Sequence, residues 1–344
     1  MEFHMLNQPA HQVLCSRCIL PDTFPGISFD EKGVCNYCRR EEPALAMNPG
    51  KKDQYRLKLD NLIRGTVSRD SSYEVIAAYS GGKDSSYTLK LLKEHYGVRI
   101  LALTFDNHFV SPQTWTNIKN VVDRLGIDHL TFRPNWPIMK SLFSLAAGND
   151  LFPKPTLLRA SSICTACIGL VKSLTLKTAL EMSIPFVAFG WSPGQAPLQS
   201  SIMKNNPVFV RENQKAFKKA LPTEIAEPFE GCFIPESYYE RYKDSFPYNI
   251  HPLAFFDYDE ESIKSEIAAL GWEAPTNTDS NSTNCLLNAL ANEGHLKRHG
   301  FHPYVMEIAN MVRQGVMTRE EGLEKIYSPQ DMGQVGYARE KLGI

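Results

Sequence analysis

The sequence predicts an α/β fold in which helices cover both faces of a parallel sheet. Three observations predict it: short apolar runs of strand length recur along residues 75–190, segments with helical spacing separate them, and a glycine turn directly follows the first run. Strands that alternate with helices form parallel sheets whose two faces are both covered. A small N-terminal cysteine ribbon and a C-terminal helical subdomain complete the predicted fold.

The elements of the predicted sheet domain follow one another in a regular order. The strands are expected at residues 75–79, 99–105, 128–132 and 185–190. The helices are expected at residues 54–64, 84–95, 115–125 and about 165–183. The third of these helices has an apolar stripe at helical spacing and ends at Gly126, since glycine commonly terminates helices.

The periodic pattern weakens after residue 190. Residues 191–260 are rich in proline and aromatic residues, whereas residues 262–270, 285–293, 304–314 and 318–326 have helical spacing. The chain is therefore predicted to contain an N-terminal cysteine ribbon at 6–45, an α/β domain at 54–230 and a helical region at 231–344. Residues 204–219 are locally basic and are expected to form a solvated mobile loop.

Length, composition and charge exclude several classes of protein. The chain has 344 residues, of which 43% are hydrophobic and 22% charged, a normal globular composition. Its formal net charge is −1, so no overall basic field drives nucleic-acid binding. We find no run of about 18 apolar residues and no signal-peptide pattern, so we expect a cytoplasmic protein without a membrane segment.

The eight cysteines are the first strong chemical signal. Six of them form three C-x-x-C pairs, and in a reducing compartment such pairs usually bind metal or carry out redox chemistry. The first two pairs are Cys15 with Cys18 and Cys35 with Cys38, separated by sixteen residues. Four thiolates from two tight turns fill all positions of a tetrahedral zinc site, so we predict structural Zn²⁺ here; free buried thiols are the alternative.

A glycine-rich loop, residues 80–86, lies between the first predicted strand and its helix. Gly81 and Gly82 allow a turn in which backbone N–H groups converge on an anion, and the helix N-terminus adds its dipole. Lys83 supplies positive charge, and the serine hydroxyls supply further donors. The loop is neither a Walker A nor a dinucleotide-binding motif. Its alternative reading is an ordinary turn with Asp84 as a helix cap.

The loop Ser80-Gly81-Gly82-Lys83-Asp84-Ser85 resembles the SGGxDS loop of the PP-loop (N-type) ATP pyrophosphatases. The resemblance implies that these six residues bind the pyrophosphate end of ATP with Mg²⁺, and that Lys83 and Asp84 act in catalysis. A substrate oxygen would attack the α-phosphate and release pyrophosphate. Asp106 matches a position that contacts adenosine or Mg²⁺ in such enzymes, and Gly190 is expected to allow close approach of adenine. Plain turns are the alternative for both residues.

The third cysteine pair, Cys164 with Cys167, begins a predicted helix, and Cys285 lies much later in the chain. This order resembles the iron–sulfur PP-loop thiolation enzymes of the tRNA thiouridine and thiocytidine synthetase type. The resemblance implies that the three cysteines hold a 4Fe–4S cluster with one open iron. A catalytic thiol pair, whose pKa the helix N-terminus would lower, and buried packing residues are the alternatives. Cys232 is expected to be a buried thiol.

The predicted reaction is the ATP-dependent replacement of a carbonyl oxygen by sulfur. We expect a small-molecule substrate, a nucleobase or similar heterocycle, and a sulfur donor or donor protein. A tRNA acceptor is a less favoured alternative because a wide basic face is lacking. The ribbon with the glycine loop also resembles N-acetyl sugar amidotransferases, which would use ammonia from a partner glutaminase. The sequence leaves a homodimer open.

Overall fold

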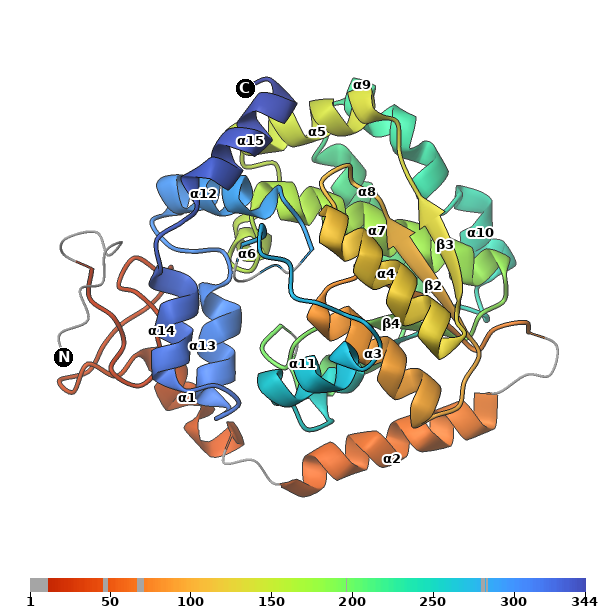
Figure 1. Ribbon diagram of the computed structural model, residues 1–344, viewed down its shortest axis with the longest axis horizontal. Coiled ribbons are helices and arrows are strands. Elements are labelled where there is room, and N and C mark those ends of the chain that lie inside the picture. Colours follow the sequence, from red (N-terminus) through yellow and green to blue (C-terminus); the bar gives the residue numbers. More distant parts are fainter. Residues whose placement is uncertain (1–11, 46–48, 67–70, 196, 280–281, 283) are drawn as a thin grey trace.

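The fold is built on one six-stranded sheet. The structure is a computed structural model that describes residues 12–45, 49–66, 71–195, 197–279, 282 and 284–344 (Figure 1). The strand order is β3-β2-β1-β4-β6-β5. The strands are β1 (Val75–Ala78), β2 (Ile100–Phe105), β3 (Asp128–Phe132), β4 (Phe186–Phe189), β5 (Ile202–Lys204) and β6 (Tyr248–Ile250). Neighbouring strands run parallel except β5, which pairs antiparallel with β6 at the edge.

Helices surround this sheet. Those before β4 are α1 (Asn36–Leu45), α2 (Pro49–Thr66), α3 (Lys83–Glu94), α4 (Pro112–Leu125), α5 (Trp136–Gly148), α6 (Lys154–Leu157) and α7 (Ser162–Glu181). Those after β4 are α8 (Pro207–Lys219), α9 (Thr223–Ala226), α10 (Glu236–Arg241), α11 (Glu260–Ala268), α12 (Asn288–His299), α13 (Val305–Arg313), α14 (Arg319–Tyr327) and α15 (Met332–Leu342). Short 3-10 helices are η1 (Leu198–Ser200), η2 (Glu227–Cys232) and η3 (Pro252–Ala254).

The two faces of the sheet belong to two different hydrophobic cores. Alternate residues of a strand point to opposite faces, and Ile76 accordingly packs into one core while Val75 and Ala77 pack into the other. The first core contains apolar residues of α5, α7, α12 and α15. The second contains those of α2, α3, α4 and α11. The predicted α/β class, with helices on both faces of a parallel sheet, is therefore confirmed.

Two short strands extend the sheet beyond the four that the sequence predicts. β6 pairs with β4, and β5 pairs with β6, although both come from the segment that lacks clear periodicity. Each strand has three residues, which is too short for an alternating pattern to be recognised. The sheet therefore reaches past residue 230, where the sequence places the end of the α/β domain.

Two local expectations after β4 are wrong. The basic residues 204–219 form not a mobile loop but mainly the helix α8, because Pro207 occupies its first position and the Asn206 side chain accepts hydrogen bonds from two backbone N–H groups. Cys285 does not lie in a helix, since it forms an antiparallel bridge with Val110. The helix α12 begins only at Asn288.

The N-terminal ribbon packs against the C-terminal helices. A third core joins the four ribbon cysteines to apolar residues of α13 and α14, beside which Figure 1 shows the ribbon. Arg319 donates hydrogen bonds to the carbonyl oxygens of Cys18 and Cys15, at 3.0 and 3.2 Å. One small core thus joins the ribbon to α13 and α14.

Helix α7 alone among the described helices has the length and apolar composition to cross a membrane. In this fold it lies against β1, β4 and α5, and its residues Leu170, Leu174 and Ala179 are buried in the first core. Its apolar composition is accounted for by that packing.

Candidate functional site

The predicted site residues gather at the carboxyl edge of the sheet. In the strand order, β2 and β3 lie on one side of β1, whereas β4 and β6 lie on the other. Parallel α/β sheets bind ligands at the point where the strand order reverses, outside the carboxyl ends of the strands. The glycine loop follows β1, Asp106 follows β2 and Gly190 follows β4, so all three occupy this edge.

The glycine loop needs its glycines for two different reasons. Gly81 has a φ of +74°, and a Cβ at this position would lie 2.6 Å from Ile118 and 2.7 Å from Thr114. Gly82 precedes the first residue of α3 and has no side chain to accept from the N–H groups of that helix. The turn thus brings backbone N–H groups and a helix N-terminus to one place, an arrangement that fits a phosphate.

Gly190 packs directly against this loop. A Cβ on Gly190 would lie 2.5 Å from Cα and 2.7 Å from the backbone nitrogen of Ser85. No atom of that backbone can yield without moving the first turn of α3. Gly190 therefore allows the end of β4 to support the loop, whether or not it also faces a ligand.

Lys83 and Asp84 form a compact polar group with Tyr258. The Lys83 Nζ lies 2.6 Å from Asp84 Oδ1 and 2.6 Å from the Tyr258 hydroxyl, which donates to the same carboxylate oxygen at 2.9 Å. Burial, followed by the charge of Asp84, raises the pKa of Tyr258 well above its usual value, so it stays protonated. The group presents one ammonium and one carboxylate beside the loop.

Glu307 of α13 is a second acidic side chain beside this group. The Ser192 hydroxyl donates to its carboxylate at 2.6 Å. Burial, reinforced by the negative charge of Asp84, raises the pKa of Glu307 to about 7. It therefore exchanges a proton near neutral pH at the loop that follows β4.

Asp106 is tied to its own loop. Its carboxylate pairs with Arg133 at 3.2 Å and accepts a hydrogen bond from the backbone N–H of His108 at 2.9 Å. His108 has a φ of +67°, a left-handed conformation that is uncommon for a residue with a side chain. These contacts hold the backbone of residues 106–109 in a sharp turn at the edge of the sheet.

The ribbon cysteines fit a zinc ion. Zn–S bonds of about 2.3 Å in a tetrahedron place neighbouring sulfurs about 3.8 Å apart. The Sγ atoms of Cys15 and Cys38 lie 3.9 Å apart, and those of Cys18 and Cys35 lie 3.8 Å apart. Among the described residues these four form the one group of three or more possible metal ligands whose ligand atoms all lie within 4.8 Å of one another. All four thiols are buried, as a closed structural site requires.

The other three predicted ligands converge as well. The Asn107 Nδ2 donates to the Sγ of Cys167 at 3.7 Å and to the Sγ of Cys285 at 3.5 Å. Cys164 lies one turn before Cys167 at the start of α7, where the Ser161 side chain caps the helix. The bridge between Val110 and Cys285 brings the distant cysteine to this place. The three sulfurs are spread more widely than the ligands of one ion.

The wide spacing of the three sulfurs and one buried amide nitrogen without a partner fit an inorganic group that is larger than a single metal ion. Each cysteine of a 4Fe–4S cluster binds a different iron, so its ligands lie farther apart than those of a single ion. Asn288 accepts hydrogen bonds through Oδ1 from Tyr304 and Cys164, whereas its buried Nδ2 has no partner among the described residues. Buried amide groups are rarely left unpaired, so this Nδ2 is a donor beside Cys164 that is available to a further acceptor.

Burial controls the protonation of these thiols. It raises the pKa of Cys164 to about 12 and also raises those of Cys167 and Cys285, which the Asn107 hydrogen bonds partly offset. The helix N-terminus therefore does not produce a low pKa at Cys164, in contrast to the expectation for a catalytic thiol pair. Cys232 is buried in the first core, as predicted.

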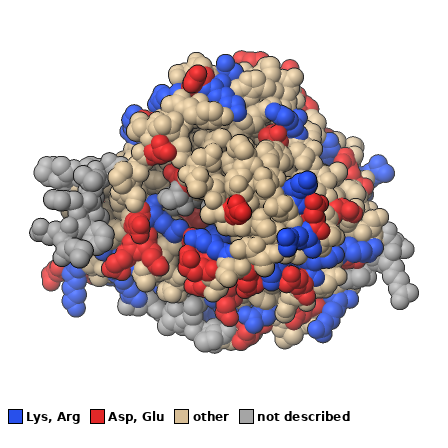
Figure 2. Space-filling view, viewed as in Figure 1, with Lys and Arg blue, Asp and Glu red and all other residues tan. Residues whose placement is uncertain are grey.

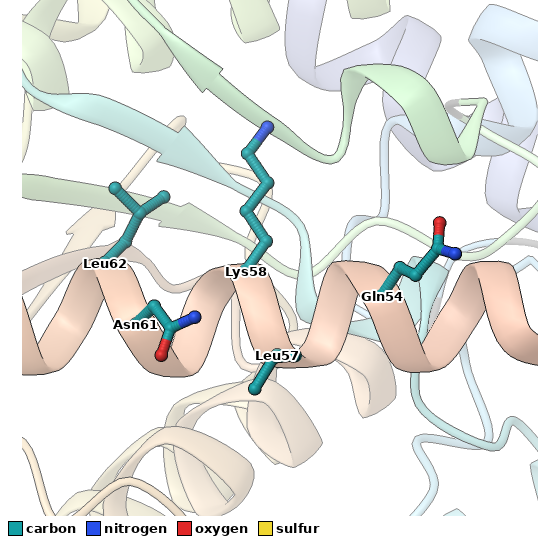
Figure 3. Close-up of a pocket in the computed structure, with 5 residues that line it drawn as sticks. All are labelled: Gln54, Leu57, Lys58, Asn61 and Leu62. Carbon is teal, nitrogen blue, oxygen red and sulfur yellow. The ribbon is translucent and has the colours of Figure 1, made fainter.

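Two cavities differ in their position relative to this edge of the sheet. A hollow of about 470 Å³ lies along α2, and all its lining residues come from that one helix (Figure 3): Gln54, Leu57, Lys58, Asn61 and Leu62. None of them is a predicted site residue. A larger cavity of about 910 Å³ lies between α11, α13 and α14 and reaches Tyr258, which contacts Lys83 and Asp84. None of the residues that line the larger cavity belongs to the glycine loop, which it approaches through Tyr258.

Four polar residues of this site are not predicted from the sequence: Asn107, Tyr258, Asn288 and Glu307. Asn107 directly follows Asp106 at a strand end, and this position could have marked it. The other three lie in segments without a motif, and only the packing of the C-terminal helices brings them to the sheet.

Comparison with known proteins adds the following. No family model matches the chain. It is 22% identical to an uncharacterized protein of Methanocaldococcus jannaschii over 316 residues, which cover 92% of this chain and 93% of that protein.

Among solved structures, U34-tRNA thiolase NcsA from Methanococcus maripaludis, with its 4Fe–4S cluster, is 18% identical with a TM-score of 0.33, covering 85% of this chain and 90% of that chain. A predicted subunit of tRNA methyltransferase from Methanocaldococcus jannaschii is 18% identical with a TM-score of 0.33, covering 67% and 90%. NMN synthetase from Francisella tularensis is 13% identical with a TM-score of 0.29, covering 74% and 94%. Similarities of this size do not assign a function.

The glycine loop lies between β1 and α3, the position that the PP-loop resemblance of the sequence predicts. The chain therefore has an α/β fold with a glycine loop at the carboxyl edge of a mostly parallel sheet, a four-cysteine ribbon near its N-terminus and a second cysteine group at the same edge.

Proposed function

We propose that this protein is an ATP-dependent sulfurtransferase, which adenylates a carbonyl oxygen and replaces it with sulfur. One observation supports this most directly. Asp106 and Asn107 are consecutive: the first lies at the strand edge next to the glycine loop, and the second contacts the sulfurs of Cys167 and Cys285. The residues that we propose bind phosphate and those that we propose bind a soft metal thus lie at the same edge of the sheet.

The loop residues carry out the first half-reaction. The carbonyl oxygen of the substrate attacks the α-phosphorus of ATP, a C–O–P linkage forms, and the bond to the β-phosphate breaks to release pyrophosphate. The loop N–H groups, the α3 N-terminus and Lys83 stabilise the charge on the departing phosphates. Asp84 is a carboxylate of the kind that holds Mg²⁺ beside phosphate.

The cysteine group serves the second half-reaction. When bound, a 4Fe–4S cluster on Cys164, Cys167 and Cys285 supplies one iron with an open position for an exchangeable ligand. Sulfide from a donor attacks the adenylated carbon, the C–O bond to AMP breaks as the C–S bond forms, and loss of the sulfur-bound proton leaves C=S.

A small-molecule acceptor is favoured over tRNA. Basic and acidic side chains are interspersed on the face that Figure 2 shows, without a broad field of one sign. On α8, Arg211 pairs with Glu236 and Lys218 pairs with Glu230, so neighbouring carboxylates balance part of the positive charge of this helix. The cavity of about 910 Å³ has a volume typical of small-molecule sites.

A second candidate is an amidotransferase that uses ammonia instead of sulfur. The ribbon supports it, since the resemblance to N-acetyl sugar amidotransferases rests on that cysteine spacing together with the glycine loop. Ammonia transfer needs no soft ligands at the second cysteine group. The metal content therefore distinguishes the two candidates.

The deciding experiment measures iron, sulfide and zinc in protein purified and reconstituted without oxygen. We expect about four irons per chain for a three-cysteine cluster, and the Cys285→Ser variant should lose them. The matched control is Cys232→Ser, because this buried cysteine lies outside both groups and should keep all metals. Zinc without iron would contradict the sulfurtransferase and support the amidotransferase.

The acceptor is tested by AMP formation. Pyrophosphate and AMP should be released with a nucleobase or related heterocycle and a sulfide donor, and mass spectrometry should find sulfur in place of oxygen in the product. Release that requires tRNA would instead assign the acceptor to tRNA.

A further inference from the structure

Asn107 contacts two of the three cysteines of the proposed cluster site. It is buried, with 8% of its surface exposed, and follows β2 by two residues. Its single Nδ2 group donates to the Sγ of Cys167 at 3.7 Å and to the Sγ of Cys285 at 3.5 Å. These two cysteines come from α7 and from the bridge to Val110, so the amide joins two separate segments.

The orientation of this amide is determined by its other end. The Oδ1 of Asn107 accepts a hydrogen bond from the backbone N–H of Phe109 at 2.9 Å. A rotation of the amide by 180° would place Nδ2 against that N–H donor and Oδ1 against the sulfurs, so the observed orientation is the paired one. The NH₂ group is therefore directed at the sulfurs before any metal binds.

The turn that carries Asn107 is held from both sides. On one side Asp106 accepts from the His108 N–H, and on the other Lys341 of α15 donates to the His108 carbonyl oxygen. The left-handed φ of His108 is maintained by these contacts. A side chain on so constrained a backbone keeps its place, as a group that orients metal ligands must.

We propose that Asn107 is a positioning residue that holds Cys167 and Cys285 convergent and stabilises negative charge on their sulfurs when the cluster is bound. This inference rests on the sulfurtransferase proposed above. An N–H donor favours a sulfur with more negative charge, and the reduced cluster is the more negative state. Hydrogen bonds to the sulfurs are one of the factors that determine the reduction potential of such clusters. Asn107 is therefore expected to raise that potential and slow the loss of iron.

Two substitutions distinguish loss of the Asn107 hydrogen-bond donor to sulfur from disruption of the turn that carries it. Asn107→Asp keeps an oxygen that accepts from the Phe109 N–H, but it replaces the donor to sulfur with a negative charge. Asn107→Leu removes both contacts. The matched control is Asn117→Asp on α4, because Asn117 is also a buried amide, with both ends bonded to the Glu273 backbone and no contact with the cysteines.

The experiment reconstitutes each protein without oxygen and measures iron per chain, the reduction potential and the rate at which a chelator removes iron. We expect the reduction potential to be highest in the wild type, lower in Asn107→Leu and lowest in Asn107→Asp. Chelation should be about tenfold faster in the Asp variant, in proportion to the loss of metal affinity of about tenfold or more that removal of a metal ligand's partner causes. The Asn117→Asp variant should match the wild type in potential.

The outcomes distinguish failure of this inference from failure of the proposed function. An Asp variant that matches the wild type while the Leu variant is impaired would assign Asn107 to the turn alone and overturn the inference. Unchanged potentials and chelation rates in both variants would overturn it as well. A wild-type protein that takes up no iron would overturn the proposed sulfurtransferase and this inference with it.

Discussion

The Nζ of Lys83 lies 2.6 Å from the hydroxyl of Tyr258, a residue that comes 175 positions later in the chain. The ammonium also lies over the aromatic ring of Tyr258, 4.8 Å from its centroid. The glycine loop after β1 is thus in contact with the segment that leads into α11. Through Tyr258 the loop also adjoins the cavity of about 910 Å³.

Replacement of Lys83 or Asp84 by alanine should abolish pyrophosphate release. Lys83 supplies positive charge to the departing phosphates, and Asp84 supplies a carboxylate for Mg²⁺. The circular dichroism spectrum and melting temperature should stay close to those of the wild type, which separates lost chemistry from lost fold. Lys58→Ala on α2 is the control for removal of a lysine away from the loop. Unchanged release in either loop variant would refute the ATP site.

Gly190→Ala should damage both the loop and the stability of the protein. The added Cβ would lie 2.5 Å from the Ser85 Cα, so the first turn of α3 must move. Overpacking of this kind costs about 1–3 kcal/mol, which a denaturant titration would measure. ATP affinity should fall at the same time. Gly231→Ala is the matched control, because a Cβ there meets no atom within 4 Å.

The ribbon should hold one zinc per chain independently of iron. Cys35→Ser should lose that zinc and loosen α13 and α14, because these helices share a core with the ribbon. Limited proteolysis would detect the exposed C-terminal helices, and elemental analysis would detect the zinc. A Cys35→Ser variant that keeps its zinc would show that the four ribbon cysteines do not form the site.

Glu307 should make the protein less stable as the pH rises. Its pKa is raised by burial from an ordinary value of 4.5 to about 7, so the folded state binds a proton that the unfolded state releases. The resulting stabilisation is fully present below about pH 4.5 and is lost as the pH rises to about 7. The effect is at most on the order of 3 kcal/mol, from about 1.4 kcal/mol per pKa unit.

Denaturant unfolding between pH 4.5 and 8 measures this dependence. Glu307→Gln keeps a side chain that pairs with Ser192 but cannot ionise, so its stability should vary less over this interval. If the wild type and the Gln variant show the same pH dependence, Glu307 does not titrate as inferred.

Local pattern was enough to predict four of the six strands, β1 to β4. The apolar runs that became β1, β2 and β4 have at least four residues, and each is flanked by a helical stripe or a glycine turn. The strands β5 and β6 have three residues each and depend on the edge of β4 for their hydrogen bonds. Such short strands leave no periodic pattern, because their pairing is decided by a neighbour far away in the chain.

The sequence by itself determined the glycine loop, the four-cysteine ribbon and the start of α7 at Cys164 and Cys167, since each depends on residues that are close together in the chain. The tertiary structure decided that Asn107 reaches both Cys167 and Cys285, and that Tyr258 and Glu307 lie beside the loop. The residues that these contacts join lie at least 60 positions apart in the chain. Hydrophobic packing of whole helices brings them together. No spacing along the chain encodes such a contact, because the distance between two side chains in space depends on every element packed between them.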